Sequence, residues 1–162
     1  ALPLFVAVQP PYRMTMFADF LRRLTAPEPT RLPDPDARLA LTALLVRLAK
    51  SDGDYAQDEI DRIDRITQRR FGISPFEATK LRADAEGLEA EAPDTVRFTR
   101  AIKDAVAYED RLGVIEAMWE VVLADGVRDS DEDALLRLVA PMLGVTDQES
   151  ALARQKISGA RG

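Results

Sequence analysis

Residues 38–59 read RLALTALLVRLAKSDGDYAQDE, and residues 111–132 read RLGVIEAMWEVVLADGVRDSDE. In each stretch apolar residues recur at helical spacing over a wide face, which predicts a buried α-helix that ends near an Asp-Gly pair. A glutamate follows the aspartate of that pair seven residues later, where a second helix is predicted to begin. The chain therefore contains one helix–loop–helix unit twice, and this unit is expected to organise the fold.

The repeat continues beyond these two stretches. At an offset of 73 residues Arg38 aligns with Arg111; one residue then drops out, and residues 71–74 (FGIS) align with residues 143–146 (LGVT). Both copies place a glutamate three residues later, which is the pattern of a capped helix start. No alternating β-branched run or hairpin turn predicts a strand. We therefore expect an all-α fold, a compact bundle of about seven to eight helices with an internal two-fold repeat.

Four prolines divide the N-terminal part of the chain from the rest. They cannot continue a helix, so they predict a linker after a short helix at about residues 16–24. The proline positions are Pro27, Pro29, Pro33 and Pro35. Residues 16–35 would then be this helix and linker, and residues 36–162 the main helical domain. Residues 1–15 are expected to be an upstream extension or a cloning remnant, because Met14 and Met16 stand at an amphipathic helix start.

Composition excludes several classes of function. The 162-residue chain has a net charge of −6, which disfavours nucleic acid as a partner. It has no Cys and no His, so thiolate and imidazole sites are excluded. Any metal must therefore be held by oxygen atoms, which favours calcium or another hard divalent cation. No apolar run is long enough for a membrane span.

The Asp-Gly loops are the candidate site. Asp52 and Asp125 each follow a long helix, where the negative end of the helix dipole makes a carboxylate cost up to about 1 kcal/mol. Further acids crowd both loops, and a bound cation would relieve their mutual repulsion. The predicted metal ligands are Asp52, Asp54, Glu59, Asp125, Asp129 and Glu132.

Helix capping is the alternative explanation of the same residues. Glycine takes the left-handed conformation that ends a helix, and a glutamate in the first turn can cap the next helix. The loops are not EF-hands, because the glycine and the glutamate stand at the wrong positions. The second loop has Val127 where the first has Asp54, so we expect it to bind more weakly. One shared site and two separate sites both remain open.

The paired motifs resemble those of the TerB family of tellurite-resistance proteins. The first motif is Ser51-Asp52-Gly53 with Glu59, and the second is Ala124-Asp125-Gly126 with Glu132. The likeness covers roughly residues 36–156 and includes Arg111 and the Leu-Gly-Val at 143–145. The chain departs from the pattern at Ser51, which replaces an alanine, and at Arg128, which replaces an apolar residue.

This resemblance implies a bundle of about seven helices in a bacterial, cytoplasmic and non-enzymatic protein. It also implies a role in resistance to tellurite and other stresses, and divalent metal binding, chiefly of calcium, by acidic motif residues. The residues implicated in this way are Asp52, Glu59, Asp125 and Glu132, with Asp54 in addition. Tellurite is an oxyanion and its reduction needs thiols or a redox cofactor, so we do not expect this acidic, cysteine-free chain to act on it directly.

Two other functions are alternatives to cation binding. The first is a protein–protein interaction or scaffold module without metal, related to TerB-like domains attached to co-chaperones and acting with other proteins of a stress-response system. Phe17, Phe20 and Leu21 would then dock on a partner, although completing the core is the favoured interpretation. The second is an enzyme, which we do not expect because no second catalytic group accompanies the exposed carboxylates.

For four further features the sequence predicts whether the residues are buried, exposed or loosely held. Trp119 stands on an apolar face and is expected in the core. The pair Arg69-Arg70 is expected on a solvated helix face. Residues 86–91 are expected to be an exposed acidic helix end, and residues 157–162 a frayed basic tail.

Overall fold

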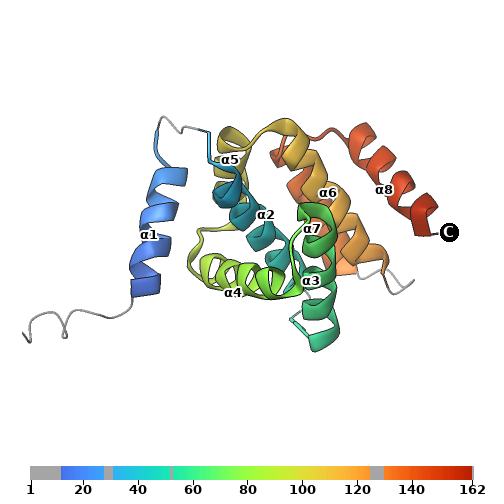
Figure 1. Cartoon of the computed structure of the whole chain (residues 1–162). Helices are drawn as coiled ribbons and strands as arrows, with labels where there is room; N and C mark the ends of the chain where they lie inside the picture. Colours follow the sequence, from blue (N-terminus) through green and yellow to red (C-terminus); the bar gives the residue numbers. More distant parts are fainter. Residues whose placement is uncertain (1–11, 28–30, 52, 125–129, 162) are drawn as a thin grey trace, which may run out of the picture.

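The computed structural model describes residues 12–27, 31–51, 53–124 and 130–161, and the side chains among them at 17–27, 31–51, 53–124 and 131–159. These residues form eight α-helices and no strand, which confirms the predicted all-α class (Figure 1). The helices are α1 (Tyr12–Leu24), α2 (Asp34–Ala49), α3 (Gln57–Phe71), α4 (Pro75–Glu91), α5 (Thr95–Ala105), α6 (Tyr108–Leu123), α7 (Ser130–Met142) and α8 (Asp147–Arg161).

The two apolar helices of the repeat, α2 and α6, pack against each other in the middle of the bundle. Around them, α2 packs against α3 and α4, and α6 packs in the same way against α7 and α8. Helix α5 joins the two halves and contacts both α2 and α7. In Figure 1, α1 lies at one side of this arrangement and α8 at the other. The spatial pairing therefore follows the internal repeat of the sequence.

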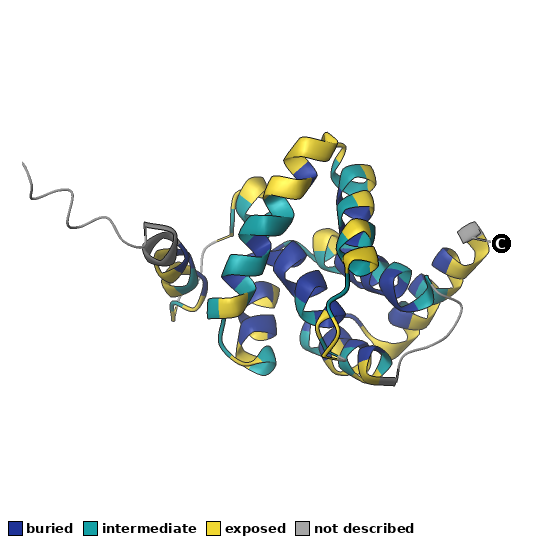
Figure 2. Cartoon of the chain, turned by 90° about the horizontal axis from the view of Figure 1, so that it is seen from below, coloured by how far each residue is buried: buried dark blue, intermediate teal, exposed yellow. Residues whose placement is uncertain are grey.

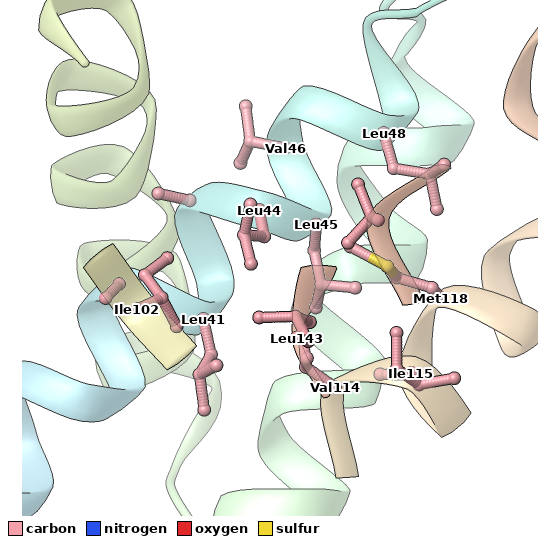
Figure 3. Packing of buried hydrophobic residues seen from close by; sticks show 14 of the residues in the cluster. Leu41, Leu44, Leu45, Val46, Leu48, Ile102, Val114, Ile115, Met118 and Leu143 are labelled. Carbon is pink, nitrogen blue, oxygen red and sulfur yellow. The ribbon is translucent and has the colours of Figure 1, made fainter. Parts of the chain in front are cut away.

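Burial explains why α2 and α6 are central. Ten residues of α2 and seven of α6 are buried, and Figure 2 shows buried residues concentrated in the middle of the molecule. The close view in Figure 3 shows Leu41, Leu45 and Leu48 of α2 near Val114 and Met118 of α6. Each fully buried side chain of this size contributes about 1.5–3 kcal/mol to stability. These two helices supply more of the buried core than any other helix does, as their wide apolar faces predict.

The capped helix starts are confirmed in both halves. The Ser74 hydroxyl accepts a hydrogen bond from the Glu77 N–H at 3.1 Å, and the Glu77 carboxylate accepts one from the Ser74 N–H at 3.1 Å. Thr146 and Glu149 form the same reciprocal pair at 3.1 and 2.9 Å. Before each box the chain turns through a glycine of positive φ, Gly72 at 63° and Gly144 at 76°.

Two helices extend further than the sequence suggests. Helix α1 begins at Tyr12, four residues before the expected start, and α8 continues to Arg161. The expectation of a frayed tail at residues 157–162 is therefore wrong for residues 157–161. Ala153 and Ile157 lie four residues apart on one face of α8, and both are buried. Burial of that face stabilises the helix where composition alone suggests a loose end.

Helix α1 completes the core rather than presenting a free apolar face. Phe17, Phe20 and Leu24 are buried, and α1 packs against α4 and α5. The Phe17 ring lies so close to Gly87 that a Cβ there would stand 2.6 Å from the ring. Trp119 is also in the core, and its Nε1–H donates a hydrogen bond to the Ser150 hydroxyl at 3.1 Å. The core interpretations of these aromatic residues are confirmed.

Replacing Leu48 by alanine tests the central packing. Leu48 is fully buried in α2, so Leu48→Ala is expected to lower the free energy of unfolding by about 2–5 kcal/mol in urea denaturation. Leu152→Ala is the matched control, because Leu152 is 63% exposed in α8. Its effect should stay within about 0.5 kcal/mol. Equal effects of the two substitutions would contradict the assigned core.

The second capping box predicts a pH response. Hydrogen bonds from the Tyr108 hydroxyl and from Thr146 hold the pKa of the Glu149 carboxyl below its ordinary value of 4.5. A lowered pKa in the folded state adds stability that is complete above pH 4.5 and is lost as the pH falls through the folded-state pKa. An NMR titration should therefore place the Glu149 midpoint below 4.5. Tyr108→Phe should raise that midpoint, and an unchanged midpoint would show that the hydroxyl does not act on this carboxylate.

Candidate functional site

The first acidic loop connects α2 to α3. Asp52, a predicted metal ligand, lies outside the described residues. The N–H of Gly53 donates to the Lys50 carbonyl at 3.0 Å, and Gly53 has a φ of +82°. The Ser51 hydroxyl donates to the Leu48 carbonyl at 2.7 Å. The glycine thus takes the left-handed conformation expected of it, and the end of α2 is closed by the loop's own backbone and by Ser51.

Two predicted ligands of this loop are placed by the structure. Asp54 is exposed beside Gly53, and Glu59 is half-buried as the third residue of α3. The Glu59 N–H donates to the carbonyl of Ala56, the residue that precedes α3, at 3.1 Å. A carboxylate in the first turn of a helix is stabilised by the helix dipole. Glu59 thus holds the third position of α3, as a capping glutamate does, although Ala56 supplies no side-chain cap, and its carboxylate lies beside the loop.

Helix α4 holds both ends of the first loop. The Lys50 ammonium pairs with Glu89 Oε1 at 2.8 Å, before the Asp-Gly pair. After it, the Tyr55 hydroxyl donates to Glu86 Oε2 at 2.6 Å. Burial and this hydrogen bond to a carboxylate raise the pKa of Tyr55 well above its ordinary value, so the hydroxyl remains a donor at neutral pH. The loop is therefore fixed on a rigid helix at two points.

Glu89 is the central residue of this attachment. Its side chain is 11% exposed and also accepts from Arg47 Nε at 3.0 Å. Arg47 in turn donates through Nη1 to the Pro93 carbonyl at 2.8 Å. The expectation that residues 86–91 form an exposed acidic end is therefore wrong. Glu89 pairs with Arg47 and Lys50, some forty positions away, and no local pattern reveals this pairing.

The second acidic loop connects α6 to α7. Asp125 and Asp129, two of the predicted ligands, lie outside the described residues. Glu132 is the third residue of α7, as Glu59 is of α3, and it is only 8% exposed. A carboxylate buried to this degree requires hydrogen-bond donors or positive charge around it. The two glutamates thus occupy equivalent positions, with the second more deeply buried.

Basic groups surround the start of the second loop. Ala124, the last described residue before it, lines a groove together with Arg62, Arg65 and Arg69 of α3. Glu120 also lines this groove and pairs with Arg69, so part of the positive charge is offset there, and the remaining positive charge disfavours a cation beside the loop. The first loop is held by acids of α4, and the second begins beside arginines of α3. The two copies of the motif therefore differ in their electrostatic surroundings.

The pair Arg69-Arg70 links α3 to α6. Arg69 pairs with Glu120, and Arg70 pairs with both Glu116 and Glu120, at 3.2 and 2.9 Å. The Arg70 side chain is 23% exposed. The expectation of a solvated helix face is therefore wrong for Arg70. The sequence shows Glu116 and Glu120 four residues apart, which indicates a charged stripe on α6. It does not show which residues pair with that stripe.

The described residues contain no group of three acidic side chains that could hold a metal ion. Asp54, Glu59 and Glu132 are placed but not gathered into such a group. The ligand prediction also depends on residues outside the described ranges, so it stays a prediction, as does the choice between one shared site and two. Among the described residues no helix is long and apolar enough to cross a membrane.

Comparison with known proteins identifies the fold family of this arrangement. The family model described as tellurite resistance protein TerB matches residues 38–155. The chain is also similar to Protein inturned of Bos taurus, with 23% identity over 117 residues. That match covers 70% of this chain but 12% of the relative, so the chain spans about an eighth of the relative's length. No solved structure matches the chain.

Replacing Glu89 tests the attachment of the first loop. Glu89→Gln removes the charge that pairs with Arg47 and Lys50, so it is expected to lower the free energy of unfolding by about 1–3 kcal/mol. The amide NMR signals of residues 50–55 should shift as well. Asp19→Asn breaks the exposed Asp19–Arg22 pair and serves as control, with an expected effect within about 0.5 kcal/mol. Unshifted loop amides in Glu89→Gln would contradict the attachment.

Proposed function

The chain belongs to the TerB family, and on that premise we propose that it is a non-enzymatic stress-response protein that binds a divalent cation, calcium or one like it, through its acidic loops. The proposed setting is the bacterial cytoplasm, and the stresses include tellurite. The cation would be the ligand that this chain binds. Other proteins of a stress-response system would respond to that binding.

The repetition of one geometry carries this proposal. In both halves an Asp-Gly loop follows a central helix, and a glutamate stands third in the next helix. Calcium takes about six to eight oxygen ligands, which carboxylates, loop carbonyls and water can supply together. The absence of Cys and His from the sequence leaves oxygen as the only ligand type. Repeated acidic loops are therefore better suited to calcium than to zinc or copper.

The two loops are not expected to bind equally. The first contains Asp54, and its ends are attached to α4 through Lys50 and Tyr55. A loop already held in place loses less conformational freedom when it binds an ion. The second has Val127 in place of the acid and begins beside the arginines of α3. We propose that the first loop binds the cation more tightly.

Tellurite resistance would then be indirect. The chain carries a net charge of −6 and has no cysteine, so it has neither an attraction for an oxyanion nor a thiol to reduce it. Sensing or buffering of a cation fits these properties. The proposal accordingly assigns no catalytic residue.

A calcium titration of the metal-stripped chain by two-dimensional NMR tests the proposal, with magnesium as a second ion. Shifts are expected at residues 50–59 and, at higher calcium, at residues 124–132. Asp54→Asn should weaken the first set of shifts, and Asp104→Asn, an exposed acid on α5, should change neither set. The absence of shifts at millimolar calcium would show that the motifs are helix-capping devices only.

An interaction module without metal is the second candidate function. The observation that favours it is the matched relative, in which the segment similar to this chain is a small part of a much longer protein. A domain carried in this way commonly binds another protein or another part of its own chain. The same titration separates the two candidates, because this module has no calcium-dependent shifts.

A further inference from the structure

A cavity of about 250 Å³ lies at the other end of α2 from the first acidic loop. It is formed where the first half of α2, the end of α3 and the start of α6 meet. Leu41, Ile66 and Val114 give it an apolar interior, and Arg38 and Arg70 add two guanidinium groups. Leu41 and Val114 are labelled in Figure 3. The cavity contains none of the predicted metal ligands, so it is separate from the proposed cation site.

The internal repeat shows that Arg38 is available. Its counterpart Arg111 donates hydrogen bonds to the carbonyls of Val106 and Leu143, and so closes the turn after α7. Arg38 makes no such bond: within the described part of the chain its guanidinium forms no side-chain hydrogen bond or ion pair, and its charge only adds to the capping-box hydrogen bonds in lowering the pKa of the Glu77 carboxyl. It lies over the Phe71 ring at 5.1 Å from the ring centroid. Arg111 thus stabilises the fold through its hydrogen bonds. Arg38 borders the cavity, and its N–H groups have no acceptor among the described residues.

Arg70 is the second arginine of the cavity. Its two terminal nitrogens pair with Glu116 and Glu120, but its Nε is buried and has no hydrogen-bond partner. A buried donor without an acceptor is unfavourable and uncommon in folded proteins. Arg70 lines the cavity, but this Nε is itself shielded from it, so Arg38 is the arginine placed to donate to a bound molecule.

We infer that this cavity binds a small molecule with an apolar body and a carboxylate head. The body would contact the apolar interior, and the carboxylate would accept hydrogen bonds from Arg38, whose planar guanidinium matches a carboxylate. An apolar cavity of about 150 Å³ holds one benzene molecule, so this cavity suits about ten non-hydrogen atoms. Medium-chain fatty acids such as octanoate have this size.

Acids at the mouth of the cavity do not cancel this attraction. Asp34, Glu109 and Asp110 lie in the first turns of α2 and α6, where they offset the positive ends of the helix dipoles. All three are exposed, so water and salt screen their charges. Arg38 is more buried than these acids, and the charge of a more buried group acts more strongly on a neighbour. The charge of Arg70 is already offset by Glu116 and Glu120.

Two substitutions test the site in different ways. Arg38→Gln removes the charge expected to hold the carboxylate. Gly113→Leu fills the cavity, because a Cβ at Gly113 meets no atom within 4 Å and leucine favours a helix more than glycine does. The matched controls are Arg100→Gln, on exposed α5 surface, and Gly159→Leu, a helical glycine in α8 that also has open space around it.

Octanoate is the probe, added to the full chain and followed by calorimetry and two-dimensional NMR. We expect saturable binding with shifts at the cavity residues, weakened by about tenfold or more in Arg38→Gln and abolished in Gly113→Leu. Both controls should bind as the unaltered chain does, and thermal unfolding verifies that every variant is folded. The inference is overturned if the unaltered chain does not bind octanoate, if folded Gly113→Leu still binds it, or if octylammonium binds more tightly than octanoate.

Discussion

The contact between α2 and α6 is the interaction on which the other parts of the structure depend. Both helices bury many apolar residues, and packing against each other and against their neighbours removes these residues from water. Once they pair, their ends fix where the loops begin. The acidic motifs follow the ends of these helices, and the cavity lies beside their starts.

The two halves share this arrangement of helices, but equivalent residues in them make different contacts. In the second half Arg111 closes the turn at Gly144, where a Cβ would stand 2.7 Å from its Nη1. In the first half the equivalent Arg38 stacks on Phe71 instead. The loops differ in the same way, since the first is attached to acids of α4 and the second begins beside arginines of α3. A repeated fold thus gives each half a different electrostatic environment, and the proposed cation and carboxylate sites both lie mainly in the first half.

Local features of the sequence predicted much of the fold. The caps at Ser74 and Thr146, the left-handed Gly53 and the buried face of α2 each depend on neighbouring residues, and each is confirmed. The predictions that were wrong concern pairings between distant segments. Glu89, Arg70 and the last turns of α8 are ordered by partners on other helices, which periodicity and capping rules do not identify. The cavity could not be predicted, because it depends on which side chains fail to fill the space between three helices.

The candidate site was predicted in part. The position of Glu59 and Glu132 in the first turn of a helix follows from the motif, but the attachment of the first loop to α4 does not. That attachment holds the first loop in place for the cation binding that we propose as the role of the motifs. Equilibrium dialysis of metal-stripped protein against calcium, with the bound ions counted per chain, tests this claim most directly. Our account predicts saturable retention of calcium, with one ion per chain for a shared site or for the first loop alone and a second, weaker ion if both loops bind separately. No retained calcium at millimolar concentration would contradict it.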